Sequence, residues 1–180
     1  KNTAGVGIIF YVMCALRQHL REKGSFDTYP EPNLAEFLDL VALGTVADVV
    51  SLDAANRILV FQGLARIRSG NCRPGIKALI DIAGRNITRL AASDLGFALG
   101  PRLNAAGRLD DISTGIELLL TDSMDQARVL ASELDNLNQE RKEIEAGMQQ
   151  EAMVELEKLQ LNNNIELPWG LCLFQETWHQ

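Results

Sequence analysis

The feature of the sequence that most restricts the fold is a long helical pattern in the last third of the chain. Ser123, with Gln126 three residues later, can cap its start, and the pattern can continue to about Leu159. Its apolar residues recur at nearly heptad spacing, at Ala127, Leu130, Leu134, Leu137, Ile144 and Met148. At about 1.5 Å per residue, this pattern predicts on the order of 55 Å of helix, which is longer than a small domain is wide.

A helix of this length usually connects two parts of a protein, although it could also be one strand of a dimeric coiled coil. We favour the connector, because Arg141 interrupts the apolar seam and the polar run Asn162-Asn163-Asn164 follows. A strand-like segment at 169–174 comes next. We therefore expect a connector helix over 123–161 and the start of a second domain over 162–180. The chain begins without methionine, so we expect it to be part of a larger protein.

Helical patterns also predominate before residue 123, so the sequence predicts a mostly α fold. An N-terminal helix is expected over about 4–22. Later helix starts are marked by capping residues or by proline, at Asn33, Asp53, Pro74 and Thr114. The third helix should bury the face that carries Val60, Phe61, Leu64 and Ile67.

Composition limits the classes of protein that the chain can represent. Its 180 residues are 47% hydrophobic, which is enough to build a core. Cys14, Cys72 and Cys172 are odd in number and widely spaced, which favours reduced, buried thiols in a cytoplasmic protein over disulfides or a zinc site. The apolar stretch 4–16 is too short to cross a bilayer, so we expect no membrane segment.

Charge is distributed very unevenly along the chain. The net charge is −7, yet residues 54–108 carry nine arginines and lysines against two aspartates. A local basic stripe of this kind suits a polyanion, because binding to nucleic acid depends on local phosphate contacts. The alternative is that these cations are scattered over several helices and neutralised by the acidic flanks.

Two arginines of this basic segment flank a run of small residues, Arg102-Leu103-Asn104-Ala105-Ala106-Gly107-Arg108, which follows Gly100-Pro101. We expect a tight turn, because glycine, proline and asparagine favour turns and the alanines leave backbone N–H groups accessible. Guanidinium groups beside such a turn can hold phosphate by two-point contacts. The alternative is a corner between helices in which the arginines pair with Asp110 and Asp111.

Asp48 is the acidic candidate for a functional site. If the helix after Asn33 continues to this point, Asp48 lies at its C-terminal end, where the helix dipole disfavours an anion. No lysine or arginine occurs between Gly24 and Asn56, so a metal ion or a distant arginine is the expected partner. Magnesium or manganese suits such a carboxylate. The alternative is an ordinary turn aspartate that accepts nearby backbone hydrogen bonds.

Five segments, in this order and at this spacing, resemble successive signatures of the RecJ family. This family comprises bacterial 5′→3′ exonucleases specific for single-stranded DNA, within the DHH phosphoesterase superfamily. The segments are 40–50, Asn56-Arg57, 73–76, 100–109 and 178–180. The resemblance implies that 1–122 is the C-terminal, helical part of an α/β DHH catalytic domain, and that the strand near 169 begins a DHHA1 domain.

The same resemblance assigns roles to individual residues. Asp48 falls on the last metal-ligand aspartate of the family, which makes it the implied catalytic and metal-binding residue. The implied contacts to DNA phosphates are Arg102, Asn104, Arg108, Arg73 and Arg57, and the other motif positions are Gly44, Thr45, Asn56, Gly107 and His179. The implied cofactors are two Mn²⁺ or Mg²⁺ ions. Implied partners are single-stranded DNA, a helicase and a single-strand-binding protein, in bacterial DNA repair and recombination.

The remaining ligands of such a metal centre do not occur in this sequence. The family's aspartate-rich motif and its Asp-His-His triplet are absent, and His19 and His179 cannot supply paired ligands. We therefore expect the parent protein to be an enzyme and this chain alone to be inactive. Three alternatives stay open, namely another DHH phosphodiesterase or pyrophosphatase, a non-catalytic helical domain that binds nucleic acid, and a purely structural helical module.

Overall fold

A computed structural model describes residues 2–109, 111–162, 170–176 and 178, and every regular element in these residues is helical. The main helices are α1 (Gly5–Glu22), α2 (Leu38–Ala47), α3 (Ala54–Arg68), α4 (Pro74–Ile82), α5 (Ala92–Asp94), α6 (Gly100–Leu109), α7 (Ser113–Leu120) and α8 (Met124–Asn162). The short 3₁₀ turns are η1 (Ser25–Asp27), η2 (Leu34–Phe37) and η3 (Ile87–Arg89), and η4 (Leu95–Leu99) is a π-helical turn. The mostly α fold expected from the sequence is confirmed.

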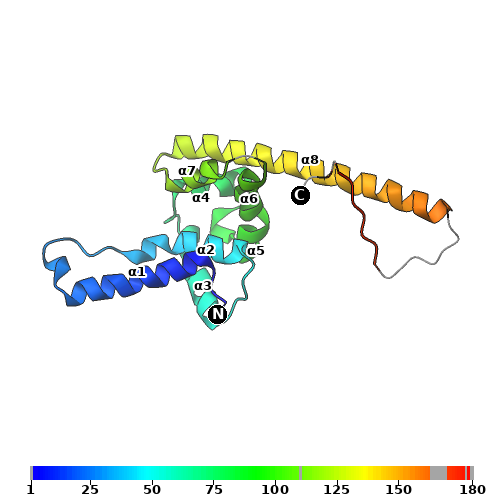
Figure 1. Ribbon diagram of the computed structural model, residues 1–180. Helices are drawn as coiled ribbons and strands as arrows, with labels where there is room; N and C mark the ends of the chain where they lie inside the picture. The colour runs from blue at the N-terminus through cyan, green and yellow to red at the C-terminus, as the bar shows by residue number, and fades with distance from the viewer. Residues whose placement is uncertain (1, 110, 163–169, 177, 179–180) are drawn as a thin grey trace.

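The helices form two groups (Figure 1). A main core joins α2 and α3 to α4, α6, α7 and α8, and a smaller core lies between α1, α2 and α3. The first part of α8 packs over α4, α6 and α7, while α2 lies against α1, α3 and η4. The side chains at the centre of the molecule are fully buried leucines and isoleucines, among them Ile67, Ile76, Leu79, Ile80, Leu95, Leu99, Leu118 and Leu134. At about 1.5–3 kcal/mol for each such side chain, this burial is the main favourable contribution to folding.

The crossing of α2 and α3 depends on a glycine. A Cβ atom built on Gly63 would lie 2.2 Å from the carbonyl oxygen of Leu38 and 2.4 Å from the Cβ of Ala42. No other residue fits there without separating the two helices. Through this contact α3 holds α2, whose C-terminal end carries Asp48.

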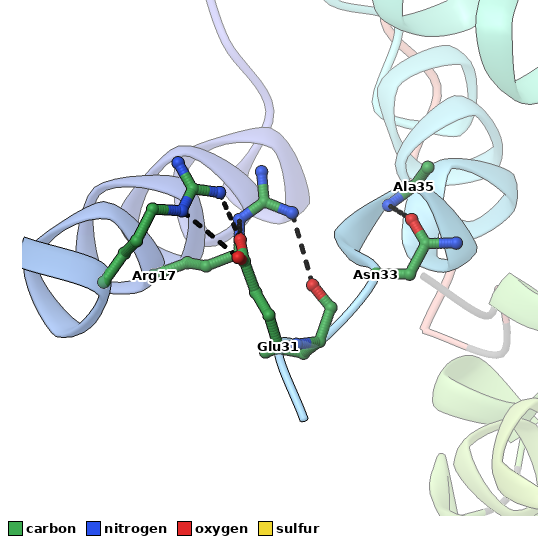
Figure 2. A network of polar contacts seen from close by, with 6 residues as sticks. Arg17, Glu31, Asn33 and Ala35 are labelled. Carbon is green, nitrogen blue, oxygen red and sulfur yellow. Dashed lines mark hydrogen bonds and ion pairs between the residues drawn. The ribbon is translucent and has the colours of Figure 1, made fainter. Parts of the chain in front are cut away.

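Capping residues define the starts of η2 and α3 as the sequence predicts, and Pro74 opens α4. The predicted cap at Thr114 is wrong, because α7 already begins at Ser113 and the residue before it, Ile112, provides no side-chain cap. The Asn33 side chain accepts a hydrogen bond of 3.3 Å from the Ala35 N–H at the start of η2, and Asp53 accepts one of 3.0 Å from the Asn56 N–H at the start of α3. Figure 2 shows the Asn33 cap beside the ion pair that joins Arg17 of α1 to Glu31. Arg21 of α1 also pairs with Glu31. These ion pairs tie the loop before η2 to α1.

The long helix predicted after Ser123 is present as α8, which begins at Met124 and has 39 residues. The Ser123 hydroxyl accepts a hydrogen bond of 3.3 Å from the Gln126 N–H, so the predicted cap is confirmed. Among the described side chains of α8, the buried ones lie in its first part, at Ala127, Leu130, Ala131, Leu134 and Asn138. The later part extends beyond the other helices (Figure 1), where Met153 is 54% exposed.

Three further local expectations are wrong. Residues 100–109 form α6 and not a tight turn, because proline is accepted in the first turn of a helix and the alanines favour helix. Phe61 is 64% exposed and lies off the buried face of α3. Cys172 is exposed and not buried.

The predicted strand at 169–174 also fails where the structure describes it. Residues 170–174 form no strand, and no strand occurs among the described residues to pair with them in a hydrogen-bonded ladder. Trp178 instead donates a hydrogen bond of 2.8 Å from Nε1 to Oε2 of Glu151 on α8. No helix in the described parts of the chain is both long enough and apolar enough to cross a bilayer.

Candidate metal and nucleic-acid site

Asp48 lies directly after the last turn of α2, as the sequence predicts. Its backbone N–H donates to the Gly44 carbonyl oxygen at 3.0 Å and completes the helix. The chain then turns sharply through Val49, which has a φ of 54° and is 87% exposed. The Asp48 side chain is exposed and forms no hydrogen bond or ion pair with any described residue.

This position leaves a negative charge without compensation. The last carbonyl groups of α2 carry partial negative charge, so the helix end disfavours an anion beside it. An added cation would relieve both charges at once, and carboxylate oxygens are preferred ligands of Mg²⁺ and Mn²⁺. The Asp48 carboxylate therefore fits a metal ligand chemically.

One carboxylate does not make a metal centre. In the described parts of the chain, no group of three or more histidine, cysteine, aspartate or glutamate side chains is close enough to hold an ion. His19 lies on α1, and His179 is outside the described residues. A metal ion bound by Asp48 thus needs further ligands from outside this part of the chain.

Arg102 is held by α8. Its Nε and Nη2 atoms each lie 2.8 Å from Oδ1 of Asp135, and its Nη1 donates to the Ala98 carbonyl oxygen at 2.6 Å. Gln139 holds the other carboxylate oxygen of Asp135 at 2.8 Å. The side chains of Arg102 and Asp135 are each 15% exposed. Arg102 pairs with Asp135 and not with Asp111, because α6 packs along α8 and turns Arg102 toward it. Asp110 lies outside the described residues.

The rest of the small-residue run lies on the same helix. Asn104 is exposed, and Gly107 is exposed one turn later. Arg108 belongs to the last turn of α6, and its side chain is outside the described residues. Of the two arginines expected to form a phosphate clamp, the structure thus places one in an ion pair and describes only the backbone of the other.

Arg73 forms a buried contact with Asp39, a residue that the sequence analysis did not single out. Nη1 of Arg73 lies 2.6 Å from Oδ1 of Asp39, and the Arg73 N–H donates to Oδ2 at 3.0 Å. The guanidinium also stacks over the ring of Phe37 at 5.1 Å, and Asp39 is only 1% exposed. This pair joins the start of α4 to α2. The sequence signal for this contact is the position of Asp39 between two leucines of a core helix.

Motif residues around Asn56 hold the loop that follows Asp48. Asn56 is 1% exposed, and its Nδ2 donates to the carbonyl oxygens of Ser51 and Asn2, both at 2.8 Å. The exposed Arg57 donates from Nε to the Leu52 carbonyl oxygen at 2.7 Å. These contacts fix the backbone of the loop after Asp48.

Gly44 and Thr45 act inside α2. A Cβ on Gly44 would lie 2.7 Å from Cγ1 of Val6, so this glycine allows α1 to approach α2. Thr45 is completely buried, and its hydroxyl has no hydrogen-bond partner in the described structure. These two residues support the helix that presents Asp48 and do not reach the exposed surface themselves.

Comparison with individual known proteins identifies the family, although no protein-family model matches the chain. The chain is 65% identical over 182 aligned residues to the single-stranded-DNA-specific exonuclease RecJ of Salmonella typhimurium and 64% identical to that of Escherichia coli. Each alignment covers all of this chain. This chain belongs to the RecJ family. It spans 31% of the length of these relatives.

Solved RecJ structures share the fold. A crystal structure of RecJ from Thermus thermophilus in complex with Mg²⁺ matches 81% of this chain with a TM-score of 0.69 at 36% identity. A crystal structure of exonuclease RecJ bound to manganese matches 86% of it with a TM-score of 0.73 at 35% identity. These alignments cover 21% and 37% of the solved chains, respectively. The resemblance deduced from the five sequence segments is confirmed.

Within this RecJ segment, the basic residues are spread over several helices. Besides Arg73 and Arg102, Arg85 pairs with Asp94 at 3.4 Å, and Arg68 donates to the Leu90 carbonyl oxygen at 2.8 Å. Several cations of the basic stripe therefore serve the fold. Asp48, directly after α2, stays without a partner among the described residues.

Proposed function

We propose that this RecJ-family chain is one segment of a metal-dependent 5′→3′ exonuclease that hydrolyses phosphodiester bonds in single-stranded DNA during bacterial DNA repair and recombination. The observation that carries the proposal is the exposed Asp48 carboxylate at the end of α2, which has no partner among the described residues. The RecJ relatives named above support the substrate and the activity. The solved structures with Mg²⁺ and Mn²⁺ support the cofactors.

In this proposal Asp48 binds one of two metal ions and residues outside the chain complete the centre. Bound there, such ions would provide an activated water and would stabilise the charge that develops at phosphorus. Asn104, Arg108 and Arg57 contact the DNA backbone. Arg102 and Arg73 position α6 and α4 through their carboxylate partners.

The domain organisation and the partners belong to the same proposal. Residues 1–122 are the C-terminal part of the catalytic domain, 123–161 form the connector, and 162–180 begin the next domain. The later part of α8, which extends beyond the other helices, supports the connector role (Figure 1). Cytoplasmic location and the helicase and single-strand-binding-protein partners rest on the family resemblance.

The experiment replaces Asp48 with asparagine in the full-length parent protein. We expect Asp48→Asn to abolish Mn²⁺-dependent release of nucleotides while single-strand binding is retained, because a metal ligand is lost and no phosphate contact is changed. Asp125→Asn, at a side chain that is 94% exposed on α8, is the matched control and should keep full activity. The 180-residue chain alone should release no nucleotides. A rate close to that of the parent for Asp48→Asn at saturating metal would refute the assignment.

A further inference from the structure

Phe97 is a large aromatic side chain that the fold leaves in solvent. It is 86% exposed, although its neighbours Leu95, Ala98 and Leu99 are buried. All four belong to the π-helical turn η4. Such turns are rare, and they occur frequently at functional sites because they shift side chains away from the regular helical position. Phe97 contributes nothing to the core of the described residues, and its ring is open to a ligand.

The turn that carries Phe97 lies directly against the end of α2. A Cβ on Gly96 would lie 3.1 Å from Cγ1 of Val46, and a Cβ on Gly100 would lie 3.3 Å from the Cβ of Ala47. Val46 and Ala47 are the two residues before Asp48. The two glycines therefore bring η4 against the helix end that carries the candidate metal ligand, with Phe97 beside the contact.

Helix α6 follows directly after η4. Pro101, Asn104 and Arg108 follow one another in α6 at intervals of three and four residues, so these positions share one face of that helix. Asn104 is exposed, as Phe97 is. Arg102, by contrast, points to Asp135 on α8. The turn that carries the exposed Phe97 ring thus packs against the helix end that carries Asp48, and α6 adds an exposed amide at Asn104.

We infer that Phe97 is a stacking platform for an unpaired base of the DNA strand whose phosphodiester bond is cut beside Asp48. This inference rests on the proposed function and adds a residue that selects the substrate. An exposed aromatic ring stacks on any base, without sequence preference, when the base has an open face. Bases inside a duplex are already stacked and paired, so Phe97 favours single strands.

The test compares the full-length parent with its Phe97→Ala variant in binding experiments without divalent metal, so that the strand is not cut. The two ligands are a thymidine oligonucleotide and a strand of equal length whose sugars carry no bases. We expect Phe97→Ala to weaken binding of the thymidine strand roughly 5- to 150-fold, the range for loss of one stacked base. Binding of the abasic strand should not change. Phe97→Tyr should bind both strands as the parent does.

Phe61→Ala is the matched control, because Phe61 is another exposed phenylalanine, 64% exposed on α3. It should leave both affinities unchanged. Equal affinity of Phe97→Ala and the parent for thymidine, or an equal loss on both strands, would overturn the inference. A large fall in the melting temperature of Phe97→Ala would also overturn it, since another part of the parent would then cover the ring. Failure of the proposed function is a separate result, namely a parent that does not degrade single-stranded DNA with Mn²⁺.

Discussion

The ion pair between Arg102 and Asp135 should be a main stabilising contact between α6 and α8. Both side chains are only 15% exposed, and the guanidinium donates to Asp135 and to the Ala98 carbonyl oxygen. Removing one partner of a buried pair typically costs about 3–5 kcal/mol, because the other charge stays buried without compensation. With some remaining exposure, we expect Arg102→Ala to lower the free energy of unfolding by about 3 kcal/mol.

Thermal melts of the 180-residue chain followed by circular dichroism measure this effect. A loss of about 3 kcal/mol corresponds to roughly 6–12 °C in a chain of this size. Asp135→Ala should cost a similar amount, and the double variant should cost less than the sum of the two single losses. Arg128→Ala is the control, since Arg128 forms a surface pair with Asp125 and is 63% exposed. Its loss should stay below about 0.5 kcal/mol.

DNA binding by the full-length parent separates the structural role of Arg102 from a phosphate contact. A residue that contacts a phosphate contributes about 0.7 to the slope of log K against log salt for single strands. If Arg102 serves the fold, Arg102→Ala leaves this slope unchanged. If Arg102→Ala instead had the melting temperature of the control and a flatter slope of log K against log salt, this reasoning would be refuted. Arg102 would then be a phosphate contact.

Two further predictions concern packing and thiol chemistry. Gly63→Ala should lower the free energy of unfolding by about 1–3 kcal/mol in denaturant titrations, because the new Cβ would overlap the Leu38 carbonyl oxygen. Gly147→Ala is the control. A Cβ at Gly147 has no atom within 4 Å, so this change should stabilise α8 by about 0.5–1 kcal/mol. Burial raises the pKa of the Cys72 thiol to about 11, so little of it is thiolate at pH 8. Mass spectrometry after brief alkylation at that pH should find the exposed Cys172 modified first; faster modification of Cys72 would contradict the structure.

Much of the secondary structure follows from local sequence signals. Capping by Asn33, Asp53 and Ser123 is a contact between near neighbours, so it could be predicted without the fold. The position of Asp48 at a helix end follows from the same local reasoning. The family could also be deduced, since five short segments occur in the right order.

The partners of the arginines could not be predicted in this way. Arg102 and Asp135 are far apart in the sequence, and the packing of α6 on α8 brings them together. Arg73 and Asp39 are also far apart, and the fold brings the start of α4 beside α2. The exposure of Phe97 could not be predicted from the sequence either. An isolated phenylalanine in an apolar run predicts burial, and its exposure depends on the π-helical turn.

The sequence by itself determined that the chain is mostly helical, that a long helix follows Ser123, and that Asp48 lies at the end of a helix. These features depend on hydrogen bonds and side-chain spacing within a few residues. The tertiary structure decided which charged side chains are already paired and which stay available to a ligand. The pairing of charged side chains depends on the distance between helices that are remote in sequence. The guanidinium of Arg102 is held by the carboxylate of Asp135, whereas the carboxylate of Asp48 has no partner in the described structure.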